Sequence, residues 1–189
     1  MIREHSVTLR PGFVAFDGVE IAELSPLNLM AIYKSLGVEY PKFYKMDLLA
    51  RLGFLAAEML MKGGTSSEER EVNGGDDNAS DGGVILFGRS GSVWTDRNYT
   101  GTIRDVSAYY PSPAAFVYTL SNIVTGEISI RHRLHGESSS YILDSRDEEL
   151  EEMMAAKAIE RGCGFILAGW CDCVAADMYE VMMNLYRKK

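Results

Sequence analysis

At residues 84–87 the sequence reads VILF, an unbroken apolar run between Gly82-Gly83 and Gly88. A strand with one face in water alternates apolar and polar residues, whereas a strand buried on both faces is apolar throughout. We therefore expect a strand here that lies inside a sheet. Because parallel strands are the ones most often covered on both faces, the sheet is expected to be partly parallel.

Helical periodicity is clear on both sides of this strand. After Asp47, apolar residues recur at helical spacing as far as Gly63-Gly64, which predicts a core-facing helix. A second amphipathic helix is expected from Asp147 to Arg161, and apolar strands are expected at 141–143 and 165–168. Strands that alternate with helices indicate an α/β fold, here a layered α/β sandwich in which helices cover a mixed sheet.

The other elements are inferred from caps, turns and periodicity. We predict a short hairpin or two edge strands over residues 13–24, and a short helix that begins at Ser25-Pro26 and ends at Gly37. A tight turn is expected over 88–92, and a long helix is expected from Ser112-Pro113 to Leu134. The tail at 178–186 fits a helix and a strand equally well.

The composition is that of a globular protein of one domain. The 189 residues include 47% hydrophobic ones and carry a formal net charge of −8. That length and apolar content suit a single domain over residues 1–189. Binding to nucleic-acid phosphates needs clustered Lys and Arg, so the acidic balance disfavours nucleic acid as a partner. The sequence shows no membrane span and no signal peptide, and its three cysteines are expected to be reduced thiols, so we expect a cytoplasmic protein.

Part of the negative charge is concentrated in residues 63–83, which contain six acidic residues, six glycines and one Arg. This segment has almost nothing to bury, so we expect a mobile acidic loop on the surface of the domain. Five more acidic residues lie at the predicted helix start, 147–152. Outside these two segments the net charge is +2, which leaves the rest of the surface able to bind an acidic partner.

Several stretches together resemble the N-terminal half of β-ketoacyl synthases, the condensing enzymes of the thiolase-like superfamily. They are KMDLLARLGFLAAEML at 45–60, VILFGRSGS at 84–92, SPAAFVYTLSNIVTGEISIRHRLHGES at 112–138, SYILDS at 140–145 and GFILAGW at 164–170. The resemblance spans residues 12–175 and is greatest to short ketoacyl-synthase N-terminal-like proteins of bacterial fatty-acid and polyene pathways. It implies a thiolase-like half, one such domain over residues 1–189, and no cofactor.

In that family an elbow between a strand and a helix carries the nucleophilic cysteine, whose thiolate is favoured by the helix N-terminus. The corresponding residues here are 143–146, where Ser145 occupies the approximate position of the nucleophile and no cysteine is near. Ser145 and Glu148 fit a capping box, S-x-x-E, which favours a structural role for the serine. The elbow therefore predicts a degenerate synthase.

The three histidines support the same interpretation. The family's catalytic histidines come from its C-terminal half, and by order none of His5, His132 and His135 matches them. His132 and His135 also lack the paired spacing of a structural zinc site, so no metal is expected. Cys171 and Cys173, which share one side of a strand, are expected to pack in the core.

Polar residues in the predicted helix 112–134 are a further candidate site. Asn122, Thr125 and Glu127 interrupt an otherwise apolar helix, either as a hydrogen-bonded core network or as the lining of an acyl pocket. The matching region of a synthase borders its acyl pocket and dimer interface, so the resemblance adds Phe116 and Tyr141 as possible pocket or interface residues.

The resemblance implies a catalytically inactive partner subunit in acyl-carrier-linked fatty-acid or polyene synthesis. The strand at 139–143 is expected to pair across a two-fold axis, either in a homodimer or in a heterodimer with an intact ketosynthase. Acyl carrier protein is a further expected partner, with Arg131, Arg133 and Lys62 as docking candidates. Two alternatives remain: a small acyltransferase or hydrolase in which Ser145 is the nucleophile and His132 or His135 the base, and a non-catalytic acyl-binding module.

Overall fold

The computed structural model describes residues 1–25, 28–63 and 81–189. Its strands form one mixed sheet of seven, in the order β3-β2-β1-β7-β6-β4-β5. The strands are β1 (Ile2–Arg10), β2 (Phe13–Phe16), β3 (Val19–Glu20), β4 (Gly83–Gly88), β5 (Ser138–Ile142), β6 (Phe165–Ala175) and β7 (Met178–Arg187). The predicted α/β class and mixed sheet are confirmed.

The apolar run of β4 lies where it was expected, between two parallel neighbours, β5 and β6. All six residues of β4 are buried. The other pairings are antiparallel, and the tail forms β7, which lies between β6 and β1 near the middle of the sheet. The sequence left that tail open and did not predict β1, in which the consecutive polar residues Arg3, Glu4 and His5 hide the apolar period.

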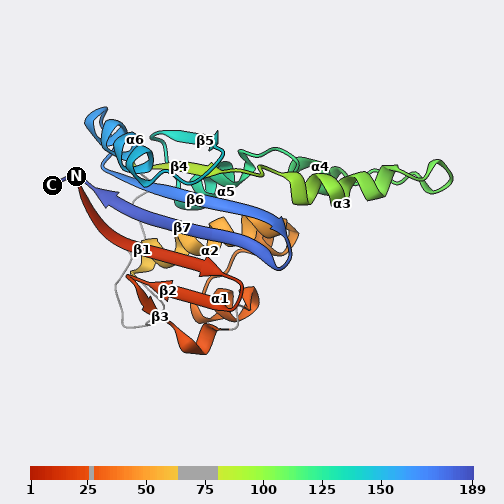
Figure 1. Ribbon diagram of the computed structural model, residues 1–189, viewed down its shortest axis with the longest axis horizontal. Helices are drawn as coiled ribbons and strands as arrows, with labels where there is room; N and C mark the ends of the chain where they lie inside the picture. The colour runs from red at the N-terminus through yellow and green to blue at the C-terminus, as the bar shows by residue number, and fades with distance from the viewer. Residues whose placement is uncertain (26–27, 64–80) are drawn as a thin grey trace.

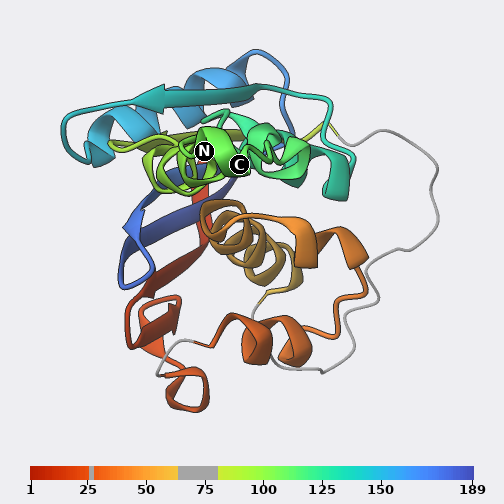
Figure 2. The ribbon, with the colours of Figure 1, turned by 90° about the vertical axis from the view of Figure 1, so that its right-hand side faces the viewer.

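One face of the sheet is covered by α1 (Leu29–Ser35), α2 (Leu48–Lys62) and α5 (Ile123–His132), which bury the larger core against β1, β4, β6 and β7 (Figure 2). The helix α2 matches its prediction closely. Asp47 caps it by accepting from the backbone N–H of Ala50, and Gly63 ends it in the left-handed conformation. The α1 prediction needs a correction, because Asn28 rather than Ser25 caps that helix, accepting from two backbone N–H groups.

The other face is covered by α6 (Glu148–Glu160), which packs on β4 and β6. Its buried partners include Ile85, Phe87 and Trp170. This helix spans fewer strands than the layer opposite, so the ends of β6 and β7 that meet at their connecting turn are not covered by it (Figure 1). The layered sandwich is therefore complete on one face and partial on the other.

An arm of residues 93–117 projects from the sheet beyond β4 (Figure 1). It consists of α3 (Val93–Ile103), the 3-10 turn η3 (Val106–Ala108) and α4 (Pro113–Val117). Two further 3-10 turns, η1 (Ala22–Leu24) and η2 (Pro41–Lys45), lie near α1. The sequence did not predict α3, because Thr, Asn, Arg and Gly give this helix little apolar periodicity.

The prediction of one long helix over residues 112–134 is wrong. The start at Ser112-Pro113 is correct, since Ser112 accepts from the Ala115 backbone N–H, but the segment forms two helices, α4 and α5, separated by residues 118–122. The hydroxyls of Thr119 and Thr125 donate to the carbonyls of Phe116 and Asn122. Such local side-chain bonds compete with continuous helix and favour a break.

The predicted acidic loop, 63–83, lies mainly outside the described residues. Within the described ranges no helix is both long and apolar enough to cross a membrane.

Candidate functional site

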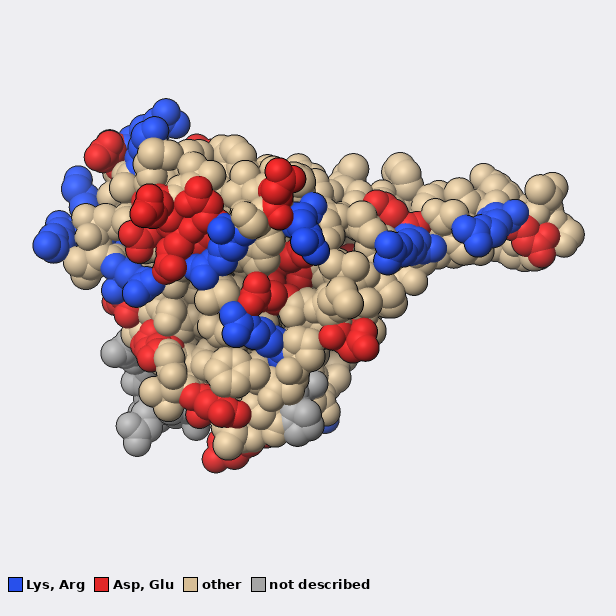
Figure 3. All heavy atoms as spheres, viewed as in Figure 1, with Lys and Arg blue, Asp and Glu red and all other residues tan. Residues whose placement is uncertain are grey.

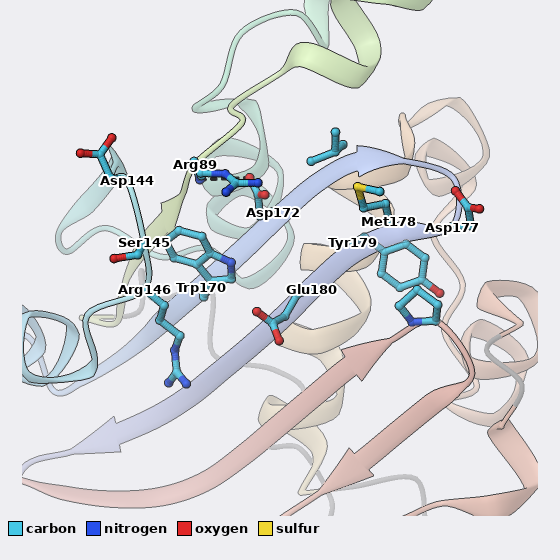
Figure 4. Close-up of a pocket in the computed structure, with 12 residues that line it drawn as sticks. Arg89, Asp144, Ser145, Arg146, Trp170, Asp172, Asp177, Met178, Tyr179 and Glu180 are labelled. Atoms are coloured by element: carbon cyan, nitrogen blue, oxygen red, sulfur yellow. Dashed lines mark hydrogen bonds between the residues drawn. The ribbon is translucent and has the colours of Figure 1, made fainter.

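A cavity of about 440 Å³ lies where the carboxyl ends of the three parallel strands meet, on the face that α6 only partly covers (Figure 4). In open α/β sheets this is the usual place for a ligand. The cavity is lined by residues that follow β4 and β5 and by residues of β6 and β7, among them Arg89, Ser145, Arg146, Trp170, Asp172 and Glu180. It contains the predicted elbow.

Asp172 organises the exit from β4. Its carboxylate accepts hydrogen bonds from the backbone N–H groups of Arg89, at 3.0 Å, and Ser90, at 2.7 Å, and from the Ser90 hydroxyl at 3.2 Å. The side chain is nearly buried, and Gly91 follows with a positive φ of 54°. These contacts form the tight turn that the sequence predicted at 88–92, and they fix the base of the arm to β6.

The elbow is exposed at Ser145, but this serine does not cap α6. Asp147 does so, accepting from the Leu150 backbone N–H at 3.0 Å. The predicted capping box of Ser145 and Glu148 is therefore wrong, because the cap of α6 lies two positions later, at Asp147. An aspartate suits this place because its full negative charge complements the positive end of the helix dipole.

A buried ion pair lies behind the cap. The Arg146 guanidinium contacts both carboxylate oxygens of Glu151, each at 3.2 Å, and Glu151 is fully buried. Burial raises the pKa of Glu151, while Arg146 opposes that shift. The first turn of α6 thus already holds three glutamates besides the capping aspartate. Such an environment disfavours a further anion, whether a thiolate, an alkoxide or an oxyanion.

No protein-family model matches the chain, and its sequence matches no curated protein. Solved structures do match it. One is described as the ishigamide ketosynthase/chain length factor, with a TM-score of 0.64 and 16% identity over 99% of this chain and 62% of that chain. Another is a ketosynthase (ApeO) in complex with its chain length factor (ApeC) from Xenorhabdus doucetiae, with a TM-score of 0.56 and 13% identity over 97% of this chain and 77% of that chain.

The chain has a thiolase-like fold. At these identities the likeness establishes the fold and not the activity. The chain spans about 62% of the length of the first of these structures.

Within this thiolase-like fold the histidines lie away from the elbow. His132 is largely buried between α5 and α2, with its Nε2 atom 3.5 Å from the Glu58 Oε1 atom, and burial lowers its pKa. His135 lines a separate cavity of about 410 Å³ together with Arg161 and Cys163. Neither histidine is among the residues that line the cavity of Ser145. Among the described residues no group of three or more His, Cys, Asp or Glu is placed to hold a metal ion.

The five candidate pocket residues are divided among three places. Thr125 and Glu127 are buried in the core, where Glu127 accepts from the Tyr118 hydroxyl at 3.1 Å and pairs with the Lys42 ammonium at 2.8 Å. Phe116 in α4 and Asn122 just before α5 lie at the surface, and Tyr141 of β5 stacks on Phe87. The polar residues of this segment were expected either to form a core network or to line an acyl pocket, and the contacts of Glu127 are those of a core network.

The free edge of the sheet at β5 carries an apolar surface. Among the described strands β5 is paired with β4 alone. In the described ranges, fourteen large hydrophobic side chains are exposed, and eight of them lie between residues 106 and 142: Val106, Tyr109, Tyr110, Phe116, Val117, Leu120, Ile130 and Ile142. Between Pro111 and Ile130 the only charged residue is Glu127, which is buried.

The segment that follows α4 reaches the end of β5. Ser121, which follows Leu120, and Ile142, which ends β5, both line a small cavity of about 10 Å³ beside Gly91. We call Phe116, Val117, Leu120 and Ile142, together with the open side of β5, the edge surface. Sequence reasoning found the strand and Phe116, but it missed the projecting arm because α3 was not predicted.

Two of the three basic residues proposed for carrier docking are engaged inside the fold. The Arg131 Nε atom lies 2.5 Å from the Glu58 Oε1 atom, and its guanidinium lies over the Tyr40 ring. The Lys62 ammonium donates to the Leu36 carbonyl at 2.5 Å. These contacts leave both cations poorly placed to bind a partner.

Proposed function

We propose that this chain is a ketosynthase-like partner subunit, which pairs with an intact ketosynthase in polyketide or polyene synthesis and does not itself condense acyl groups. The observation that carries this proposal is the edge surface: a free edge strand beside exposed apolar residues in a segment without exposed charge. We treat residues 1–189 as one ketoacyl-synthase N-terminal-like domain in this role.

The edge surface has the properties of a permanent subunit contact. A free edge strand presents unpaired backbone groups that invite another strand, and soluble proteins usually protect such an edge with charges or a covering element. Here the edge strand contains three serines and no charged residue. Large apolar patches that lack charge mark subunit interfaces. Both features argue that another chain covers β5.

The partner is inferred from the fold. The two solved structures are described as a ketosynthase/chain length factor and as a ketosynthase in complex with its chain length factor. A heterodimer with a ketosynthase is therefore the assembly we propose, and a homodimer is the competing outcome of the experiment. In the heterodimer the partner supplies the catalytic cysteine and histidines, and its substrates arrive on acyl carrier protein.

The elbow supports a non-catalytic role. No histidine is among the described residues that line the cavity of Ser145, and the adjacent helix N-terminus is already occupied by the Asp147 cap and by the Arg146–Glu151 pair. A serine nucleophile needs a base within about 3 Å and a site that tolerates negative charge.

The experiment is co-expression with an intact ketosynthase of the kind that pairs with a chain length factor, followed by native mass spectrometry. We expect a one-to-one heterodimer, which Phe116→Asp/Leu120→Asp weakens at least about tenfold, a change of about 1.4 kcal/mol. The matched control is Val19→Asp, because Val19 is an equally apolar residue, 70% exposed, on β3 at the opposite edge of the sheet. This control should leave the heterodimer intact.

The catalytic alternatives are tested with the purified chain alone. Carrier-bound malonyl and acyl substrates and simple acyl esters should not be turned over. Turnover that is lost in Ser145→Ala would overturn the non-catalytic role. A homodimer that excludes the ketosynthase, or equal effects of the Val19 and Phe116/Leu120 substitutions, would overturn the proposed interface.

A further inference from the structure

The cavity of about 440 Å³ at the carboxyl ends of the parallel strands, which we call the elbow cavity, is lined by six charged residues, and three of them are satisfied within the protein. Asp172 accepts from the turn after β4, and Arg146 pairs with Glu151. Glu180 pairs with Arg10, with 2.7 Å between the Glu180 Oε1 atom and the guanidinium. Figure 3 shows acidic and basic groups intermingled over β6 and β7.

The other three charged residues of the elbow cavity have no partner within the described part of the chain. They are Arg89, Asp144 and Asp177. Figure 4 shows the two aspartates at opposite ends of the cavity, with Arg89 between them. One arginine and two aspartates sum to a charge of −1, so a ligand that matches all three carries one negative and two positive groups.

A buried tryptophan distinguishes this cavity from a solvated surface. Trp170 is 6% exposed, and its indole N–H has no acceptor within the described residues. A buried tryptophan N–H usually has a hydrogen-bond partner. In Figure 4 the nitrogen edge of the ring faces the middle of the cavity, on the side of Glu180. An acceptor group of a ligand would complete this bond.

An apolar strip leads from Trp170 toward Asp177. Val174 of β6 lies between these two residues along the chain, and Met178, which begins β7, lies beside Asp177. Pro11, which follows β1, lines the same cavity. These side chains suit methylene groups and offer no hydrogen bonds, so we expect the ligand to have an aliphatic stem between its polar ends.

We propose that the elbow cavity binds a free basic amino acid, lysine or arginine. The α-carboxylate accepts from the Arg89 guanidinium and from the Trp170 N–H. The α-ammonium pairs with Asp144, the stem lies along Val174, and the cation at the end of the stem pairs with Asp177. The guanidinium fork matches the two oxygens of a carboxylate. This ligand goes beyond the proposed function and does not depend on it.

The charges of the elbow cavity disfavour simpler ligands. An organic acid would bring a further anion near Asp144, which precedes the acidic first turn of α6. A simple amine would leave Arg89 and the Trp170 N–H without an acceptor. A neutral amino acid would leave Asp177 without a counter-charge. A basic amino acid supplies a partner for all four groups.

The experiment follows the two indole N–H signals, those of Trp94 and Trp170, in proton–nitrogen correlation spectra of the purified chain. We expect lysine and arginine to shift the Trp170 signal and not the Trp94 signal, which Trp94→Phe assigns. Norleucine has the stem of lysine without its terminal amine, and cadaverine is lysine without its carboxylate. Both should bind at least about tenfold more weakly than lysine. Sodium chloride at the same concentration should shift neither signal.

Two substitutions test the assigned contacts. Asp177→Asn should remove the preference for lysine over norleucine, and Arg89→Gln should weaken the binding of both. The control is Glu20→Gln, which removes an exposed carboxylate from β3, at the opposite edge of the sheet from β5. A dispersed spectrum for each variant shows that it is folded.

The outcomes separate this inference from the proposed function, because the chain is tested without a ketosynthase. A Trp170 signal that no amino acid moves, or that sodium chloride moves equally, would overturn the site and leave the proposed pairing untouched. Equal affinities for lysine and norleucine would overturn the role of Asp177 and with it the basic ligand. Equal losses in Glu20→Gln and Asp177→Asn would show a nonspecific charge effect and would also overturn it.

Discussion

Arg146 and Glu151 form a two-point ion pair, with both N···O distances at 3.2 Å, at the point where the elbow enters α6. Glu151 is fully buried, so removal of the arginine leaves a carboxylate without its counter-charge inside the protein. Breaking a buried pair in this way costs about 3 kcal/mol. We expect Arg146→Met to lower the free energy of unfolding by this amount in urea titrations.

The control for this substitution is an exposed pair that joins β1 to the same helix. Arg3 lies 3.2 Å from Glu148, and both side chains are about half exposed. Because water screens such a pair, Arg3→Met should cost less than about 1 kcal/mol. The double variant Arg146→Met/Glu151→Met should recover much of the loss, since it removes both buried charges. Equal costs for the two arginine substitutions would contradict the role assigned to Arg146.

The elements with a strong apolar period were predictable from sequence, and those fixed by tertiary contacts were not. The helix α2 and the strand β4 carry their signal in consecutive residues. The arm, by contrast, is held by bonds from Asp47 and Asp172, which are distant in sequence from Thr95 and Ser90. No local pattern reveals such pairs.

The candidate site was predictable to a similar extent. The turn from a strand into a helix was expected at 143–146, and the structure has such a turn between β5 and α6. The choice between Ser145 and Asp147 as the cap depends on where α6 begins, and both residue types are good caps. The edge strand was also found. The edge surface as a whole depends on the break between α4 and α5, where Ser121 lines a small cavity together with Ile142.

A second prediction concerns pH. Burial raises the pKa of Asp47 above its ordinary 3.8, although bonds from Thr95 and Ala50 oppose the shift. The folded state therefore keeps this proton to a higher pH than the unfolded state does. The contribution of Asp47 to stability is complete below 3.8 and is lost as pH rises through the higher folded value.

Asp47→Asn tests this effect, because asparagine can still cap α2 but cannot ionise. We expect the stability of this variant relative to the wild type to be greater at about pH 7 than at about pH 3 in thermal unfolding. Asp144→Asn, at an exposed position, is the control and should show no such trend. A pH-independent difference for Asp47→Asn would contradict the prediction.

A third prediction concerns the thiols of β6. Burial raises the pKa of Cys171 and raises the pKa of Cys173 to about 12, and both side chains pack in the larger core. Because the thiolate is the reactive form, neither should be alkylated by iodoacetamide at about pH 8 in the folded protein. Both should react after denaturation, as measured by peptide mass spectrometry.

An engineered thiol on α3 supplies the control for this measurement. Asn98 is exposed, so Asn98→Cys should react in the folded protein under the same conditions. Labelling of Cys171 or Cys173 at a comparable rate would show that the core around β6 opens readily.

The last prediction concerns the close approach of β6 and β7 at Gly169. This residue pairs with Met183 of β7 and Leu86 of β4, and its φ is 154°. A Cβ atom at this position would lie 2.1 Å from the Met182 carbonyl oxygen and 2.8 Å from the Met183 Cα atom. Both are backbone atoms in the middle of the sheet, so they can move aside only if the strands separate.

We therefore expect Gly169→Ala to cost about 3 kcal/mol or to prevent folding. Gly101→Ala is the matched control, because Gly101 lies in α3 and a methyl group there would meet no atom within 4 Å. Alanine is the better helix former, so this substitution should raise the free energy of unfolding by about 0.5 to 1 kcal/mol. Denaturant titration distinguishes the two. A Gly169→Ala protein as stable as wild type would mean that β6 and β7 are not in contact at this position. The pairing of β6 with β7 in the middle of the sheet would then be wrong.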